Sequence, residues 1–286
     1  MKLFVIPGLP NINAEKVTDT LAAAVNILTE CGADVYVDRT KADYIGSAMK
    51  TAELQDDGFD AVIAVGGDGT ILSAAKTALA WDKPLLGINA GHLGFLSGLE
   101  RNELGELRKL VSGEFTVKQR MMISAEIVLE ESGEKIAADA LNEVLIARAE
   151  AAKTAEFEVW CGGKIVCIYR GDGLIFATPT GSTAYSMSAG GPVTDPALEA
   201  IIMTPVCPHA LFARPMVFSS DKSFLVRVRK TNNSSRLYFS ADGKTVGELG
   251  LDKQLSITRS NKMLKIIELG GRDFYEVFEE KFCSNI

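Results

Sequence analysis

The sequence contains few of the residues that build metal centres or disulfide scaffolds. Its two histidines exclude a histidine-rich metal site, and its five cysteines form no Cys-x-x-Cys pair. Cysteines that are odd in number and scattered along the chain are typical of buried or free thiols in a reducing compartment. No apolar run approaches the roughly 20 residues of a membrane-spanning helix, and Met1–Pro7 lacks the apolar region of a signal peptide. We therefore expect a cytoplasmic protein with no membrane partner.

Two familiar phosphate-binding motifs are also absent. The chain contains neither the GxxxxGK[ST] loop of Walker-type proteins nor the GxGxxG fingerprint of dinucleotide-binding domains. The formal net charge of −7 argues against bulk nucleic-acid binding, which needs a basic face. A protein of this charge that handles phosphates must bind them locally, through a divalent cation, backbone amides and a few placed basic residues.

The length and composition suit two globular domains. The chain has 286 residues, of which 47% are hydrophobic and 23% charged, so a full core can be buried. In roughly the first hundred residues, apolar runs of strand length alternate with helical patterns, which is typical of βαβ units on a parallel sheet. We expect strands at 2–6, 35–37, 61–65 and 84–88, and helices at 14–30, 42–54, 70–80 and 104–111.

Beyond residue 115 the pattern changes to short strands separated by Gly, Asn, Asp and Ser turns. We expect strands at 124–130, 141–147, 157–161, 164–170, 174–177, 224–229, 237–240, 255–259 and 264–269, with a helical stretch at 182–189. The fold class predicted is therefore an α/β N-terminal domain, a parallel sheet with flanking helices, followed by a β-rich, sandwich-like C-terminal domain. We place the α/β domain at 1–100 and the β-rich domain at 101–269, with 270–286 packing back on the first.

The segment Gly66-Gly67-Asp68-Gly69-Thr70 follows the apolar run at 61–65 and precedes a helical pattern. A strand, a glycine turn and a helix start bring backbone N–H groups to a phosphate. The glycines would allow positive φ angles and let a ligand approach the backbone. Asp68 would repel phosphates, so it is expected to hold a metal or take a proton. Taken alone the motif is moderately specific, since Gly and Asp also dominate ordinary turns.

The second dense segment, 170–192, has seven hydroxyl side chains within the eleven residues from Thr178 to Ser188, bracketed by glycines. A solvated, N-capped helix start would account for some of these residues. A polar loop on a rigid scaffold is, however, where binding residues usually lie. The segment also contains Tyr185, an aromatic that could stack on a base, and Asp172, a carboxylate held between two glycines. The polar pair Asn142-Glu143 and the single basic residues Lys153 and Arg170 do not indicate a site by themselves. They become candidates only in combination with the two segments described above.

Together these segments resemble the NAD kinase family, whose members phosphorylate the 2′-hydroxyl of the adenosine ribose of NAD. The resemblance covers nearly the whole chain, and the match over Asp172–Pro192 is highly specific. It also includes 66–70, 87–96, 141–143, 205–210 with Arg214-Pro215, 241–243 and 274–277. The motif at 66–70 alone would not identify the family, because diacylglycerol kinases, sphingosine kinases and phosphofructokinases have similar motifs.

The resemblance implies roles for individual residues. Asp68 is the expected proton acceptor for the ribose hydroxyl, with Gly67, Gly69 and Thr70 against the same ligands. Asn142 and Glu143 match the pair that holds the adenosine portion of NAD. Further expected contacts to the dinucleotide are Lys153, Arg170, Asp172, Thr183, Ala184, Tyr185, Ser186, Met187 and Ser188. The metal ligands are not identifiable.

The resemblance further implies a site between the two domains, ATP or polyphosphate as phosphoryl donor, a divalent metal, expected to be Mg²⁺, and a homodimer or homotetramer in the cytoplasm. The sequence departs from the family at His92, where arginine is frequent, and at Lys244, where glutamine is frequent. Two alternatives stay open from the sequence: a lipid or sugar kinase sharing the glycine loop, and a non-catalytic dinucleotide-binding regulator.

Overall fold

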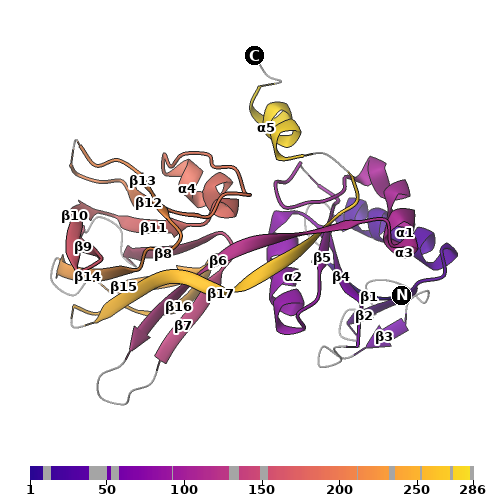
Figure 1. The fold of residues 1–286 in the computed structure, drawn as a ribbon, viewed down its shortest axis with the longest axis horizontal. Coiled ribbons are helices and arrows are strands. Elements are labelled where there is room, and N and C mark those ends of the chain that lie inside the picture. Colours follow the sequence, from indigo (N-terminus) through magenta and orange to yellow (C-terminus); the bar gives the residue numbers. More distant parts are fainter. Residues whose placement is uncertain are drawn as a thin grey trace. The chain divides into compact units, whose positions relative to one another are not determined.

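The computed structural model describes residues 1–8, 14–38, 50–52, 58–91, 93–128, 135–148, 154–210, 212–231, 236–251, 253–270 and 273–283. The chain divides into two compact units (Figure 1), one formed by Met1–Gln119 with Leu264–Ile286 and the other by Arg120–Met263. Two long strands, β6 (Thr116–Val128) and β17 (Gln254–Glu268), have residues in both units. The boundary lies between residues 119 and 120 instead of at the expected residue 100, because the helical segments at Arg101–Glu106 and Leu107–Ser112 belong to the first unit.

The first unit contains a parallel sheet in the order β17-β5-β4-β1-β2-β3. Its strands are β1 (Lys2–Pro7), β2 (Asp34–Asp38), β3 (Lys50–Ala52), β4 (Ala61–Gly66) and β5 (Leu85–Asn89), joined by the end of β17. The chain adds strands outward from β1 on one side and from β4 on the other. The strand order therefore reverses between β1 and β4, and ligands of such sheets bind at the carboxyl ends of the strands at this point.

Helices cover both faces of this sheet. On one face, the helices α1 (Ala14–Glu30) and α3 (Leu107–Ser112) share a core with Leu3, Ile63 and Leu86. On the other face lies α2 (Asp68–Ala80), whose buried residues Ile71, Ala74, Ala75 and Ala78 recur at helical spacing. Both faces of β4 and β5 are consequently buried, which explains why each reads as a continuous apolar run rather than an alternating one.

The second unit contains two antiparallel sheets. One has six strands in the order β13-β12-β11-β8-β15-β16, and the other includes β10-β9-β14-β17 with β6 paired to β7. The side chains between the sheets form one core around Phe157, Phe176, Phe224 and Phe239. The strands are β7 (Lys135–Ala140), β8 (Glu143–Arg148), β9 (Ala155–Cys161), β10 (Lys164–Gly171), β11 (Gly173–Ala177), β12 (Ala200–Val206), β13 (Met216–Ser219), β14 (Phe224–Thr231), β15 (Leu237–Ala241) and β16 (Lys244–Glu248).

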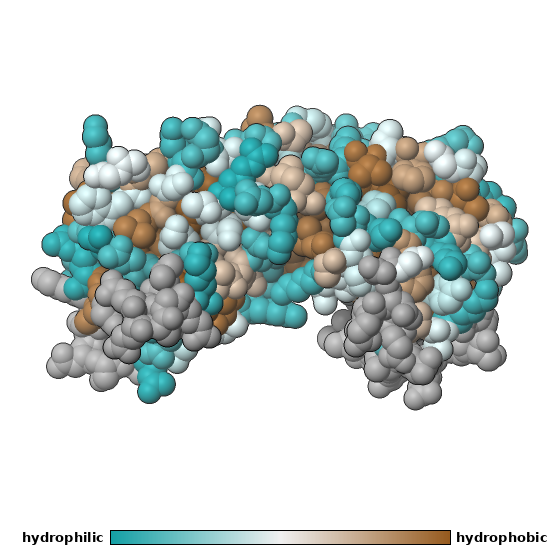
Figure 2. All heavy atoms as spheres, turned by 60° about the horizontal axis from the view of Figure 1, so that its bottom comes forward, coloured by the Kyte–Doolittle hydropathy of each residue, from teal (hydrophilic) through white to brown (hydrophobic). Residues whose placement is uncertain are grey.

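Short helical pieces complete the structure. A 3₁₀ helix at Arg101–Glu106 precedes α3, a 3₁₀ turn at Thr180–Thr183 precedes α4 (Tyr185–Ser188), and α5 (Phe274–Phe282) lies in the first unit. No described helix is long and apolar enough to span a bilayer. On the face shown in Figure 2, hydrophobic residues are interspersed with hydrophilic ones.

The predicted fold class is confirmed, with parallel strands and helices followed by antiparallel sheets. One expected element is wrong where the structure describes it. The helical pattern at 42–54 overlaps β3, in which Lys50–Ala52 pair in parallel with Tyr36–Asp38 at the edge of the sheet. Sheet pairing overrides the helix propensity of these residues, and residues 42–49 and 53–54 lie outside the described residues.

Candidate active site

The turn after β4 places Asp68 at the first position of α2. The helix therefore begins two residues before the expected start at Thr70, with Gly67 as its N-cap in extended conformation, φ −88° and ψ −179°. The carbonyl of Gly67 accepts hydrogen bonds from the N–H groups of Thr70 at 2.8 Å and Ile71 at 3.2 Å. The first amides of a helix have no acceptor within the helix and carry a partial positive charge. The helix start is thus suited to an anion.

The glycines of this turn are explained by packing and by access to the backbone, and not by unusual dihedral angles. The prediction of positive φ at Gly66, Gly67 and Gly69 is wrong, since none of the three has it. A Cβ at Gly66 would lie 2.4 Å from the Thr70 hydroxyl oxygen, so glycine is needed there for packing. A Cβ at Gly67 or Gly69 would meet no atom within 4 Å. Open space surrounds these two exposed glycines, which leaves their backbone accessible to a ligand.

The carboxylate of Asp68 is held by the backbone of a second loop. Oδ2 accepts the N–H of Phe95 at 3.1 Å, and Oδ1 accepts the N–H of Leu96 at 3.2 Å. A Cβ on Gly94 would stand 2.2 Å from Oδ1. The loop can therefore enclose Asp68 only because residue 94 has no side chain. These two hydrogen bonds fix the orientation of a partly exposed carboxylate at the carboxyl end of β4.

The loop that holds Asp68 is anchored by Asn89 at the end of β5. Asn89 is almost fully buried, and its amide nitrogen donates to Glu100 at 2.8 Å while its carbonyl oxygen accepts the N–H of Gly91 at 2.9 Å. The hydroxyl of Ser97 also donates to Glu100, at 3.2 Å. These bonds close the loop at both ends. His92, named above as a departure from the family, lies outside the described residues.

In the second unit, Asn142 and Glu143 lie at a turn that Asp242 organises. The carboxylate of Asp242 accepts the N–H groups of Leu141 at 2.9 Å, Asn142 at 2.8 Å and Glu143 at 3.3 Å. Asp242 has a left-handed backbone with φ 49°, which Asp tolerates better than most residues. A hundred residues separate these partners in sequence, so only the fold brings them together.

Glu143 is the most perturbed acid of this region. Burial, and next the negative charge of Asp242, raise its pKa from 4.5 to about 7, while a hydrogen bond from the backbone of Tyr185 lowers it. Among the described residues, its buried Oε2 has no hydrogen-bond partner. A buried carboxylate oxygen without a donor is costly, and it is a natural acceptor for a hydroxyl or amine of a ligand. Perturbed acids of this kind cluster at functional sites.

The segment after β11 packs directly on this turn. A Cβ at Gly181 would lie 2.1 Å from the carbonyl oxygen of Asn142, so glycine is required for the close approach. Thr178 donates its hydroxyl to Leu141 O at 2.5 Å, and its N–H bonds to Asn142 O at 2.9 Å. These contacts bring residues 178–188 beside Asn142 and Glu143. Two of the segments predicted to contact the same ligand are therefore neighbours in the fold.

The hydroxyls of this segment fall into two sets. Those of Ser182 and Ser186 are fully buried and bonded internally: Ser182 to the backbone of Thr194, and Ser186 to the hydroxyl of Thr204 at 2.9 Å. The side chain of Tyr185 is 43% exposed. The remaining predicted residues of the segment are partly or fully exposed: Thr183, Ala184, Met187 and Ser188. Thus much of the hydroxyl density builds the scaffold, including Thr183, whose hydroxyl donates to Thr180 O at 3.4 Å, while Tyr185 and Ser188 are exposed.

Asp172 and Arg170 lie where the chain passes from β10, in one antiparallel sheet, to β11, in the other. The carboxylate of Asp172 pairs with Arg148, at 2.7 Å to the guanidinium NH2 and 3.1 Å to Nε. The register pairs Ala177 with Glu143 but Gly173 with Ala147. At ~3.3 Å per residue this places Glu143 and Asp172 more than about 13 Å apart along β8. If both contact one ligand, they contact different parts of it.

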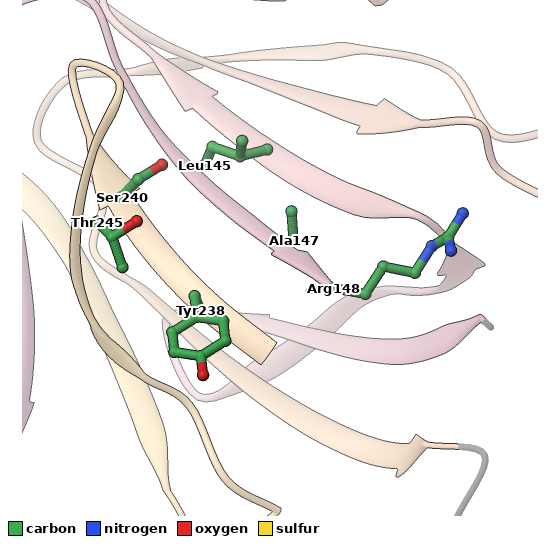
Figure 3. A pocket seen from close by; sticks show the side chains of 6 residues that line it. All are labelled: Leu145, Ala147, Arg148, Tyr238, Ser240 and Thr245. Atoms are coloured by element: carbon green, nitrogen blue, oxygen red, sulfur yellow. The ribbon is translucent and has the colours of Figure 1, made fainter. Parts of the chain in front are cut away.

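A pocket of about 350 Å³ lies on the face of β8, β15 and β16 beside this ion pair (Figure 3). Figure 3 shows Leu145 and Ala147 from β8, Tyr238 and Ser240 from β15, and Thr245 from β16, with Arg148 at the end of β8. Arg170 is exposed and donates from Nε to Thr154 at 3.1 Å. Lys153, also predicted to contact the ligand, lies outside the described residues.

The described residues contain no group of three or more His, Cys, Asp or Glu side chains that could hold a metal ion. The side chains do not, by themselves, fit a dedicated protein-held metal centre. A divalent cation would therefore depend largely on oxygen ligands from the phosphates of a nucleotide, as Mg²⁺ commonly does.

Sequence reasoning missed four residues that shape these regions. Asp242 and Gly94 belong to segments that resembled the family, but nothing local indicated that either contacts a site residue. The same holds for the N–H groups of Phe95 and Leu96, which bond to Asp68 across 27 and 28 positions of sequence. Contacts over such separations have no local sequence signal.

Two family models match the chain. The model described as the ATP-NAD kinase N-terminal domain matches residues 10–115, and the one described as the ATP-NAD kinase C-terminal domain matches residues 141–269. Among curated relatives, an NAD kinase from Natranaerobius thermophilus is 38% identical over 279 residues, covering 96% of each chain. An NAD kinase from Caldanaerobacter subterraneus subsp. tengcongensis is 35% identical over 280 residues, covering 96% of this chain and 98% of its own.

Two solved structures share the fold. An NAD kinase from Archaeoglobus fulgidus in complex with ATP has a TM-score of 0.74 at 25% identity, over 98% of each chain. Yeast NADH kinase complexed with NADH has a TM-score of 0.85 at 21% identity, over 99% of this chain and 87% of that one. At this identity the yeast enzyme supports the fold alone.

Proposed function

The chain belongs to the NAD kinase family, and we propose that it transfers the γ-phosphate of ATP to the 2′-hydroxyl of the adenosine ribose of NAD, giving NADP. One observation carries the assignment of the reacting group. Asp68 stands at the start of α2, at the carboxyl end of a central parallel strand, and backbone N–H groups orient both oxygens of its carboxylate. Matches to both NAD kinase domains favour this reaction over the lipid and sugar kinases that share a similar glycine loop.

Asp68 is the proposed general base. A ribose hydroxyl is a poor nucleophile, and a positioned carboxylate that accepts its proton in the transition state contributes about 10²–10⁴-fold. The hydrogen bonds from Phe95 and Leu96 leave Asp68 one preferred orientation, which favours a fixed distance to the attacking oxygen. The proton moves from the hydroxyl to Asp68 as the hydroxyl oxygen bonds to the γ-phosphorus and ADP leaves.

The phosphates of the donor are proposed to lie at Gly67 and Gly69. Both glycines are exposed, and a Cβ on either would meet no atom within 4 Å. The amides at the start of α2 and the helix dipole favour an anion there. Phosphoryl transfer depends chiefly on positioning and on neutralising the charge of the transferring group. Thr70 contributes by holding the turn: its N–H donates to the carbonyl of Gly67, and its hydroxyl packs against Gly66.

NAD is proposed to be recognised by residues of the second unit. Glu143 offers its unpartnered buried oxygen to ribose hydroxyls, beside Asn142. Tyr185 is proposed to stack on the adenine, which its partly exposed ring supports. Polar and backbone contacts along the dinucleotide are proposed for Lys153, Arg170, Asp172, Thr183, Ala184, Ser186, Met187 and Ser188. Since the hydroxyl of Ser186 is already bonded to Thr204, its proposed contribution is through the backbone.

The divalent metal is proposed to enter as part of the substrate MgATP, because the described side chains form no cluster that would hold it alone. It neutralises phosphate charge that would otherwise face a protein of net charge −7. The homodimer or homotetramer and the cytoplasmic location implied by the family resemblance stay predictions. Light scattering coupled to size-exclusion chromatography tests the first.

The decisive experiment is a coupled assay of NADP formation from NAD, MgATP and the purified protein. Diacylglycerol and fructose 6-phosphate serve as control acceptors. The variant Asp68→Asn keeps the size of the side chain and is expected to fold, to bind NAD and to lose nearly all turnover. If it keeps most of the wild-type kcat, Asp68 is not the base. If the wild type makes no NADP while binding NAD, the non-catalytic regulator is the better description.

A further inference from the structure

The C-terminal helix α5 packs on the loop that holds Asp68. The ring of Phe95 lies 6.2 Å from that of Phe282, stacked at 19°, and 5.8 Å from that of Phe274, tilted at 42°. Phe278 lies 5.0 Å from Phe282 and 6.4 Å from Phe274. Because Phe274, Phe278 and Phe282 are spaced by four residues, they lie on one face of the helix. That face forms an aromatic cluster with Phe95.

The basic side chain of Lys281 packs on the same aromatic cluster. The ammonium group of Lys281 lies 4.4 Å from the centroid of the Phe95 ring, within the range of a cation–π interaction. The ring of Phe95 therefore contacts three side chains of α5, and the backbone N–H of Phe95 donates to Asp68. Phe95 thus links the helix to the carboxylate, through its ring on one side and its backbone N–H on the other.

The helix and the loop depend on each other. α5 has only nine residues, and a helix of this length is marginal on its own in water. It begins at a defined point, because the carboxylate of Asp273 accepts the N–H of Glu276 at 2.8 Å and Glu276 bonds back to Asp273 N at 2.9 Å. On the other side, the loop contains Gly94, whose lack of a side chain leaves its backbone conformationally free. Packing of α5 against this loop therefore restricts its conformations.

We propose that α5 is a positioning element for Asp68, with Phe274, Lys281 and Phe282 acting through Phe95. The helix keeps the N–H groups of Phe95 and Leu96 aimed at the Asp68 carboxylate. Its catalytic consequence rests on the proposed role of Asp68 as general base, whereas the structural coupling does not. The helix begins at Phe274, more than 200 residues beyond Asp68 in sequence.

The coupling is tested by hydrogen exchange at the amides of Phe95 and Leu96, measured by NMR on the whole protein. In Phe282→Ala, both amides are expected to exchange faster than in wild type while those of β4 stay protected. Tyr275→Ala is the matched control: it removes an aromatic from the same helix, and its side chain is 62% exposed and packs edge-on against Phe274. Phe282→Tyr keeps the stacked ring and is expected to restore protection.

The catalytic consequence is tested by steady-state kinetics on the same variants. Since displacing a reacting group by about 1 Å can cost ~100-fold, Phe282→Ala is expected to lower kcat by about 10- to 100-fold. The KM for NAD is expected to change little, because the residues proposed to bind NAD lie elsewhere. Tyr275→Ala and Phe282→Tyr are expected to keep kcat within about twofold of wild type. Phe282→Leu and Lys281→Met, which retain more packing, serve if Phe282→Ala fails to fold, and are expected to show smaller shifts in the same direction.

The outcomes separate this inference from the proposed function. Unchanged exchange at residues 95 and 96 in Phe282→Ala overturns the coupling, whatever the activity. Faster exchange with an unchanged kcat overturns the catalytic consequence. A rise in the KM for NAD without a fall in kcat would assign α5 to binding instead of positioning. Absence of NADP formation by the wild type overturns the proposed function, while the exchange result still decides the coupling.

Discussion

Gly94 and Asp68 are in such close contact that a Cβ on Gly94 would stand 2.2 Å from Oδ1 of Asp68. The smallest possible side chain at position 94 must therefore displace either the loop or the carboxylate. We expect Gly94→Ala to fold but to lower kcat by about 100-fold, because a misplacement of about 1 Å is enough for such a loss. Steady-state kinetics and thermal unfolding, measured on one preparation, check both parts.

The matched control for this substitution is Gly105→Ala. Gly105 is exposed within the 3₁₀ helix Arg101–Glu106, and a Cβ there would meet no atom within 4 Å. Its substitution is expected to leave kcat unchanged and to alter the free energy of unfolding by less than about 1 kcal/mol. If Gly94→Ala is as active as this control, the enclosure of Asp68 has no catalytic role.

Ser186 and Tyr185 are adjacent in sequence but are expected to respond to mutation in opposite ways. The Ser186 hydroxyl is buried against Thr204 at 2.9 Å, so Ser186→Ala is expected to lower the free energy of unfolding by about 1–3 kcal/mol. The KM for NAD should stay near the wild-type value. Tyr185→Ala removes a partly exposed ring and is expected to raise the KM for NAD, since stacking on a base is worth about 1–3 kcal/mol.

Denaturant unfolding and NAD titration on both variants decide between these roles. A raised KM with unchanged stability in Ser186→Ala would make its hydroxyl a ligand contact. Unchanged NAD affinity in Tyr185→Ala would contradict the proposed stacking.

Metal removal should act through the nucleotide. Because the described side chains offer no cluster of three or more ligands, Mg²⁺ alone is expected to leave the melting temperature of the protein unchanged. MgATP is expected to raise it, since a ligand that binds only the folded state stabilises that state. Excess EDTA should abolish turnover, and adding Mg²⁺ beyond the EDTA should restore it. A clear thermal shift with Mg²⁺ alone would reveal a protein-held metal site.

The parts of the fold that sequence could predict are those with a local signal. The fully buried β4 and β5 appear as apolar runs of strand length, and the buried positions of α2 recur at helical spacing. The glycine turn at Asp68 was recognisable for the same reason. β3 was not, because its three residues form a strand only by pairing with β2 at the edge of the sheet.

The supporting contacts of the site lie beyond sequence reasoning. Asp242 bonds to Asn142 across 100 positions, and Phe95 to Asp68 across 27. Residues so far apart share no periodicity, and their pairing is decided by the packing of whole strands and loops. The glycines show a second difficulty: Gly66 was expected to serve positive φ or ligand access, but it is required because the Thr70 side chain occupies the space of a Cβ, and Gly94 is required by the Asp68 carboxylate in the same way.

Glu143 is expected to give NAD affinity and protein stability opposite dependences on pH. Burial, and next the charge of Asp242, raise its pKa to about 7. The ionised carboxylate can accept a ribose hydroxyl at Oε2 besides the backbone N–H of Tyr185, whereas protonation places a donor on the carboxyl group and reduces its capacity to accept. Below pH 7 the ionised fraction falls about tenfold per unit, and the Kd for NAD is expected to rise with it. The stability contribution has the opposite sign. The pKa of Glu143 in the folded protein lies above its ordinary value of 4.5. The contribution of Glu143 to the free energy of unfolding is therefore fully present below about pH 4.5 and is lost as pH rises through about 7.

Two variants separate the charge of Glu143 from its size. Glu143→Gln is expected to bind NAD more weakly, with a Kd independent of pH between 5 and 8, and to lose the corresponding slope in thermal stability. Asp242→Asn removes the neighbouring charge, so the pKa of Glu143 falls and the pH dependence of NAD binding shifts to lower pH. Isothermal titration calorimetry across this range checks both. NAD affinity that instead rises on acidification would mean that the protonated acid binds NAD as a hydrogen-bond donor.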